Sequence, residues 1–156
     1  MHVRAKEYFE GIRDEVVSLR RAREMLARMR AREGLKSQSY TGSGGGGGDV
    51  DADGMGAVDK RIDFERRLTQ RVADSELAID EACSILYGPD NRGGLAKLKG
   101  TQYADAICMA YCQAEPWAEI ADVMQCSTKW CRQMCDVGFR YIDAHGMACV
   151  KNARKK

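Results

Sequence analysis

The chain has 156 residues, which is enough for one domain of ordinary size or for a long-helix module with a small second unit, and too few for a large enzyme scaffold. Its 44% hydrophobic and 31% charged residues argue against a disordered protein, and no apolar run approaches the roughly 18 to 20 residues that span a bilayer. The formal net charge is only +2, and the two prolines, three phenylalanines and sparse β-branched residues predict an all-α fold.

The first ten residues carry basic and acidic side chains where a secretion signal would need an apolar stretch. We therefore expect a cytoplasmic protein with no membrane partner.

Residues 1–35 form the first predicted long helix, because only Gly11 and Gly34 interrupt the helical pattern and no proline does. Apolar residues alternate in steps of four and three, as in a coiled-coil seam. The seam positions are Ala5, Phe9, Ile12, Val16, Leu19, Arg23 and Leu26.

Residues 36–56 include five successive glycines and are predicted to be a flexible linker. Residues 57–88 form the second predicted long helix, with Val58, Ile62, Leu68, Val72, Ile79, Ala82 and Leu86 on one stripe. Each helix has a stripe that it cannot bury alone, so we expect a long, coiled-coil-like antiparallel hairpin.

Residues 94–146 are expected to form a small domain of three or four helices, followed by a basic tail at 147–156. Thr101 and Ser127 are suitable N-caps, Pro116 fits the first turn of a helix, and Gly146 fits a helix end.

The seven cysteines are an odd number, which argues against a disulfide framework. The pairs Cys108/Cys112 and Cys131/Cys135 have i,i+4 spacing, but no CxxC occurs and both histidines are distant in sequence. We expect the thiols to act as small buried hydrophobes, with no metal and no cofactor; a metal or redox role is the alternative.

Residues 117–134 read WAEIADVMQCSTKWCRQM and predict a helix-turn-helix motif. Ala121 is small where the second helix would cross, Cys126 would fill the turn, and Cys131 and Met134 would face the first helix. Thr128, Lys129, Arg132, Gln133 and Asp136 are left for the outward face, and these types include residues that bind base edges and phosphates.

The stretch EIADVMQCSTKWCRQM resembles region four of bacterial sigma factors, whose pattern is E-I-small-x-x-M-G-apolar-S, then four residues, then R-Q-apolar. The matching residues are Glu119, Ile120, Ala121, Met124, Ser127, Arg132, Gln133 and Met134. One departure is Gln125, where the family usually has glycine. A non-glycine residue there must accept a left-handed backbone at a modest cost, or the turn must differ locally.

More broadly, the chain is similar to small phage and prophage sigma-factor-like transcriptional regulators, which join an N-terminal helical hairpin to one such domain. The similarity covers most of the chain, although only its last third is motif-specific. It implies that Thr128, Lys129, Arg132 and Gln133 read promoter DNA. The regions of a true sigma factor that open DNA and grip the polymerase core are missing, so the resemblance implies a regulator and no working sigma factor.

We expect a sequence-specific binder of double-stranded DNA that regulates transcription. Its expected DNA-binding residues are Ser127, Thr128, Lys129, Trp130, Arg132, Gln133, Asp136 and Arg140. Trp130 could contact sugar or base, or could pack on the hairpin. Lys151, Arg154, Lys155 and Lys156 would add salt-sensitive attraction, since residues 126–156 carry seven basic and two acidic side chains.

Two alternative functions stay open. The chain could be a phage packaging protein akin to a small terminase subunit, or a helical adaptor that docks on RNA polymerase. RNA polymerase is also a candidate partner of the regulator. The seam of the N-terminal helices could join two copies as a homodimer instead of forming a hairpin within one chain. An enzyme is the least favoured class, because neither the acidic pair Glu115/Glu119 nor the glycine run has the neighbours that catalysis needs.

Overall fold

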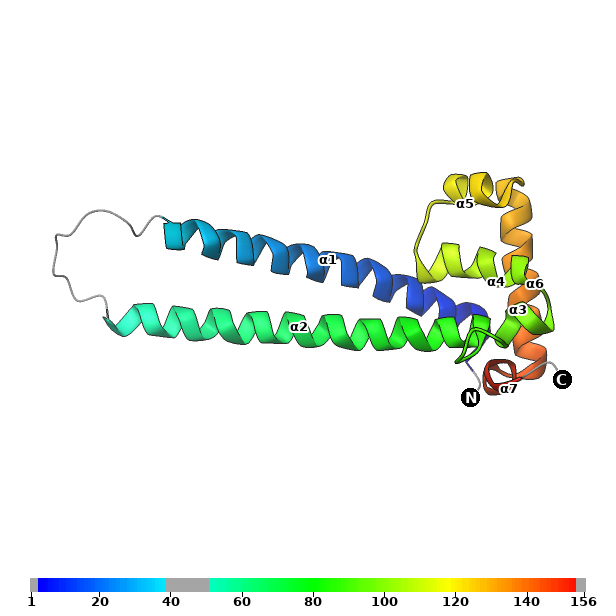
Figure 1. Ribbon diagram of the computed structural model, residues 1–156, viewed down its shortest axis with the longest axis horizontal. Coiled ribbons are helices and arrows are strands. Elements are labelled where there is room, and N and C mark those ends of the chain that lie inside the picture. Colours follow the sequence, from blue (N-terminus) through cyan, green and yellow to red (C-terminus); the bar gives the residue numbers. More distant parts are fainter. Residues whose placement is uncertain (1–2, 39–50, 154–156) are drawn as a thin grey trace. The chain divides into compact units, whose positions relative to one another are not determined.

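The computed structural model describes residues 3–38 and 51–153 and, within these ranges, all side chains except those of 35–38 and 51–58 (Figure 1). The described residues form helices and no strand, which confirms the predicted all-α class. None of these helices has the length and apolar character needed to cross a membrane. The elements are α1 (Ala5–Gln38), α2 (Asp51–Tyr87), α3 (Gly94–Leu98), α4 (Thr101–Ile107), the π-helical turn η1 (Cys108–Cys112), α5 (Trp117–Met124), α6 (Thr128–His145) and α7 (Met147–Asn152).

The chain divides into two compact units. The terminal unit combines Met1–Ser18 with Ser75–Lys156, and the middle unit is Leu19–Asp74. Both α1 and α2 therefore contribute to each unit, and the first turns of α1 belong with the small C-terminal helices. The expected division had followed the secondary-structure elements instead, with all of α1 and α2 in the hairpin.

The core of the terminal unit is built from every helix of that unit. Its largest fully buried side chains are Phe9, Leu86, Leu95, Ile107, Ile120, Ile142, Val150, Cys131 and Cys135. Three aromatic rings meet at its centre: the ring centroids of Phe9 and Phe139 are 5.6 Å apart, and those of Tyr111 and Phe139 are 5.2 Å apart. The start of α1 is thus part of the same core as α6.

Polar contacts hold the ends of the terminal unit in place. The backbone N–H of Ala5 donates to Oδ1 of Asp143 at 2.8 Å, so a side chain of α6 satisfies an otherwise unpaired donor at the start of α1. Lys151 of α7 lies 2.6 Å from a carboxylate oxygen of Glu81 on α2.

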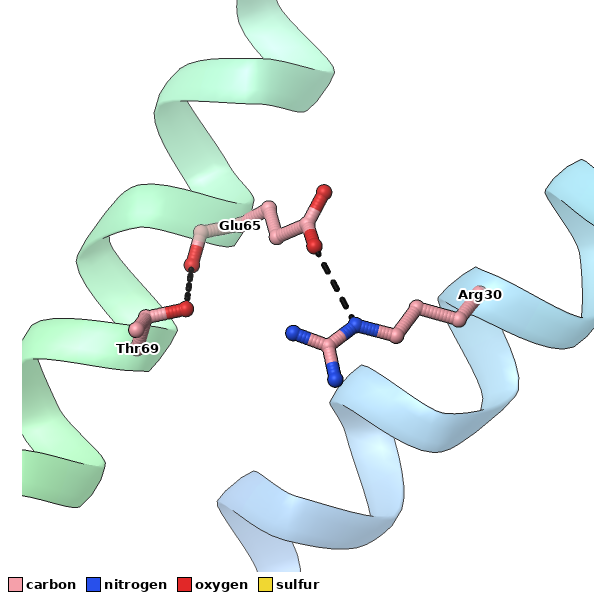
Figure 2. Close-up of polar contacts among 3 residues, drawn as sticks. All are labelled: Arg30, Glu65 and Thr69. Atoms are coloured by element: carbon pink, nitrogen blue, oxygen red, sulfur yellow. Dashed lines mark hydrogen bonds and ion pairs between the residues drawn. The ribbon is translucent and has the colours of Figure 1, made fainter.

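The middle unit pairs α1 and α2, which run side by side in opposite directions (Figure 1). Ala22 and Leu26 of α1 and Leu68 of α2 are buried there. At its edge the Arg30 guanidinium donates to Glu65 at 3.3 Å, and the Thr69 hydroxyl donates to the Glu65 carbonyl (Figure 2). The Arg30–Glu65 ion pair is largely exposed, so it adds little to the stability that the apolar contacts provide.

Two predicted stripe positions are wrong. Arg23, expected in the seam, is exposed, and Ala22 is fully buried in its place. Ile62 of α2 is 48% exposed. An α-helix has 3.6 residues per turn, so the residue that follows Leu19 on the stripe can be three or four positions later. The step of three places Ala22 on the stripe, whereas the predicted step of four would have placed Arg23 there.

Two predicted segment boundaries also change. The linker was expected at 36–56, but residues 36–38 and 51–56 are helical, and the glycine run itself lies outside the described residues. The expected basic tail contains helix α7, because Val150 is buried in the core.

Replacing Phe9 with alanine should lower the free energy of unfolding of the terminal unit by about 3–5 kcal/mol, since a large buried ring leaves a cavity. Both tryptophans of the chain, Trp117 and Trp130, lie in this unit and report on it by fluorescence during urea unfolding. Phe64→Ala is the matched control, because Phe64 is 46% exposed and its loss should change stability little. An unchanged tryptophan transition in F9A would show that the start of α1 does not stabilise this unit.

Candidate nucleic-acid interface

Helices α5 and α6 form the predicted pair of short helices joined by a sharp turn. Pro116 precedes α5 with an extended backbone, and Gln125 ends it in the left-handed conformation, at φ 54° and ψ 44°. The Ser127 hydroxyl then accepts a hydrogen bond from the Trp130 N–H at 3.1 Å and caps α6. The Ser127 cap was predicted from the sequence, and the left-handed Gln125 is one of the two alternatives that the sequence left open.

The inner face of α6 is apolar and buried. It consists of Cys131, Met134, Cys135, Gly138, Phe139 and Ile142. The Cys126 and Cys131 sulfurs are 3.2 Å apart, which closes the turn as predicted. Burial raises the pKa of Cys131 to about 11 and that of Cys135 to about 12, so both thiols are neutral near pH 7. At Gly138 a Cβ atom would lie 2.7 Å from the Ile107 side chain, so α6 approaches α4 closely there.

The outer face of α6 carries the predicted DNA-binding residues. All eight are exposed: Ser127, Thr128, Lys129, Trp130, Arg132, Gln133, Asp136 and Arg140. Lys129, Arg132 or Gln133, Asp136 and Arg140 follow each other at steps of three or four, which places them along one side of the helix. Trp130 is 54% exposed, so it does not pack as a buried anchor within the chain.

Arg132 has a partner that the sequence did not indicate. Its guanidinium carbon lies 5.1 Å from the centroid of the Trp117 ring, within cation–π range. Trp117 is itself half-buried and packs against the core, as expected for a residue beside Pro116. The aromatic ring therefore supports an exposed arginine near the start of α6.

Two hollows border the outer face of α6 and bring in residues that the sequence analysis missed. The first, of about 270 Å³, is lined by Tyr103 of α4 together with Trp130, Gln133 and Arg140. The Lys99 ammonium stands 5.6 Å from the centroid of the Tyr103 ring. The position of Tyr103 beside α6 could not be predicted from local sequence, because α4 and α6 are separate in the chain.

The second hollow, of about 280 Å³, is lined by Arg4 and Lys6 from the N-terminus and by Arg140, Asp136 and Asp143 from α6. Two cations from the beginning of the chain thus reach the side of the helix that was expected to bind DNA. The only sequence signal was their basic character.

The predicted contribution of the C-terminal basic residues stays a prediction, and one of these residues has a partner within the chain. Lys151 forms an ion pair with Glu81 inside the terminal unit, since α7 folds back on the core. The other three residues of that group, Arg154, Lys155 and Lys156, lie outside the described residues.

No family model, no curated protein and no solved structure matches this chain.

Replacing Gln125 with glycine should raise the free energy of unfolding by about 0.5–1 kcal/mol. Relief of left-handed strain, about 1–2 kcal/mol, exceeds the extra chain entropy of glycine, about 0.5–1 kcal/mol. Chemical denaturation measures the difference. Gln102→Gly, in the right-handed backbone of α4, is the control and should not gain stability. A loss of stability in Q125G would contradict the assigned conformation of the turn.

Proposed function

We propose that the protein is a sequence-specific DNA-binding transcriptional regulator of phage or prophage origin, which reads the major groove with α6 from Ser127 onward. The observation that carries the proposal is the division of α6 into a buried apolar face and an exposed face that bears all eight predicted DNA-binding residues. A helix with this division can enter a groove while its other side stays in the protein core.

Arg132 and Gln133 are the residues assigned to base edges. Arginine pairs with guanine and glutamine with adenine through two hydrogen bonds each, which is the basis of direct readout. Stacking on Trp117 restricts the directions that the Arg132 guanidinium can take, which favours a defined contact.

Phosphate contacts are assigned to the start of α6 and to its flanks. Thr128, Lys129 and the free N–H groups of the first turn suit a phosphate, because a helix N-terminus attracts anions. Arg140 and the two cations of the second hollow, Arg4 and Lys6, would contact the backbone farther along. These contacts set affinity and its salt dependence rather than sequence preference.

One recognition helix makes few base contacts, so the proposal includes self-association or a second protein. Helix-turn-helix proteins commonly bind two half-sites as dimers. A homodimer through the N-terminal helices, or contact with RNA polymerase, would supply the missing affinity.

The test begins with selection of bound fragments from a random duplex DNA pool, using the full chain. Arg132→Ala should then weaken binding to the selected site by about 1–3 kcal/mol and relax its sequence preference. Lys129→Ala should weaken binding to all sequences alike and reduce the salt slope by about one. Arg67→Ala, which removes an exposed cation of the middle unit, is the control for net charge and should bind like the parent.

The outcomes separate the three classes of function. Enrichment of a sequence, lost in the Arg132 variant, supports the proposal. A parent protein that binds no duplex DNA but captures RNA polymerase indicates the adaptor. A ring of many copies in light scattering indicates the packaging protein.

A further inference from the structure

Three cysteines that are far apart in the sequence meet in the terminal unit. Cys83 comes from α2, while Cys108 and Cys112 are the first and last residues of η1. Their sulfur atoms all lie within 4.8 Å of one another. The i,i+4 pair was visible in the sequence, but its third member was not, because α2 and η1 pack together only in the folded chain.

The spacing of the sulfurs fits a single metal ion. Zinc–thiolate bonds are about 2.3 Å long, so sulfurs that share one tetrahedral zinc lie about 3.8 Å apart. The sulfurs here lie within 4.8 Å of one another. Small side-chain rotations that shorten the sulfur–sulfur distances by about 1 Å or less would therefore let all three bind the same ion. The Cys126 and Cys131 sulfurs also lie close together, 3.2 Å apart, but no third ligand joins them within this range among the described residues.

The backbone at the pair has an unusual form. The Gln113 N–H donates to the Cys108 carbonyl at 2.9 Å, which is the i→i+5 bond of a π-helical turn. Such turns are rare and occur frequently at functional sites, where they change the direction of side chains. Here the turn begins and ends at two of the three clustered cysteines.

The surroundings favour a cation. Asp80 lies three residues before Cys83 on α2 and so on the same side of that helix, and the Tyr87 hydroxyl donates to Asp105 at 2.7 Å. Cys112 is buried, whereas Cys83 and Cys108 are half-buried, so one side of the cluster is open to solvent.

We propose that Cys83, Cys108 and Cys112 bind one Zn²⁺ ion through their three sulfurs, with a solvent molecule as the fourth ligand. Sulfur donors select thiophilic ions over Mg²⁺ or Ca²⁺. A divalent ion leaves less residual negative charge next to Asp80 and Asp105 than monovalent copper would. The bound ion would join α2 to η1 and so stabilise the terminal unit.

The test uses the full-length, reduced protein after removal of metal with a chelator. Titration with Co²⁺ should produce the charge-transfer and d–d bands of a tetrahedral thiolate site, saturating at one ion per chain, and Zn²⁺ should abolish them. The thermal midpoint should rise with Zn²⁺ concentration, because the ion binds only the folded chain.

Cys108→Ser and Cys83→Ser should each lose the cobalt bands, while Cys149→Ser and Cys126→Ser should keep them. Cys149 is exposed and Cys126 is half-buried outside the cluster, so these controls separate position from thiol number. Circular dichroism in chelator checks that the two cluster variants fold, and both positions are half-buried enough to accept serine. As a measurement on the parent alone, alkylation followed by mass spectrometry should show Zn²⁺ protecting Cys83, Cys108 and Cys112.

The proposal is overturned if the reduced parent binds neither ion, if the bands persist in both cluster variants, or if other cysteines are the ones protected. A chain that takes up only Cu⁺ also overturns it. None of these measurements involves DNA, so failure of the zinc site and failure of the DNA-binding proposal are separate results.

Discussion

The contact between Phe9 and the inner face of α6 is the interaction on which the terminal unit depends. Helix α6 has an apolar side that leaves water only when other segments cover it, and the ring of Phe9, at the start of the chain, lies 5.6 Å from that of Phe139. Tyr111 completes the contact from η1. The hydrogen bond from Ala5 to Asp143 fixes the same two helices at a second point. Burial of aromatic surface therefore joins the two ends of the sequence into one core.

This core also determines which side of α6 meets solvent. Successive residues of a helix are turned by about 100°, so shifting α6 by one position would bury Arg132 in place of Cys131. The cost of burying an unpaired guanidinium is several kcal/mol, on the order of the stability of a small domain. The exposed face is thus specified by the apolar one. Positioning on a rigid helix is what direct readout of bases requires, because small displacements remove paired hydrogen bonds.

The features that could be predicted from the sequence are those that neighbouring residues determine. The Ser127 hydroxyl caps α6 by accepting a hydrogen bond from the N–H of Trp130, three residues later. The place of the turn at Gln125 follows from the spacing of the two helices. The inside and outside of α6 follow from its three- and four-residue spacing. The choice between Ala22 and Arg23 could not be made in this way, since it depends on where the partner helix lies. Helix α7 was missed because Gly146 ends α6, and only the packing of Val150 shows that the chain continues as structure.

The candidate sites divide along the same line. The candidate residues of α6 are close in sequence, so their common exposed face could be predicted, whereas Arg4 and Lys6 reach Arg140 only through the folded chain. The meeting of Cys83 with Cys108 and Cys112 is likewise tertiary. Cysteine is a common buried residue, so its presence in a helical pattern carries no information about metal until three sulfurs are seen together.

The middle unit restricts how two copies could associate. The α1 residues Ala22 and Leu26 are already buried against Leu68 of the same chain, so a dimer formed through this stripe would have to break that contact. Such an exchange gains no apolar burial unless the partner covers more surface than α2 does. Ile62 and Phe64 of α2, by contrast, are 48% and 46% exposed. A dimer through the helices of this unit that leaves the internal pairing intact would therefore use apolar side chains that remain exposed, and the heptad seam of α1 would stabilise the chain itself.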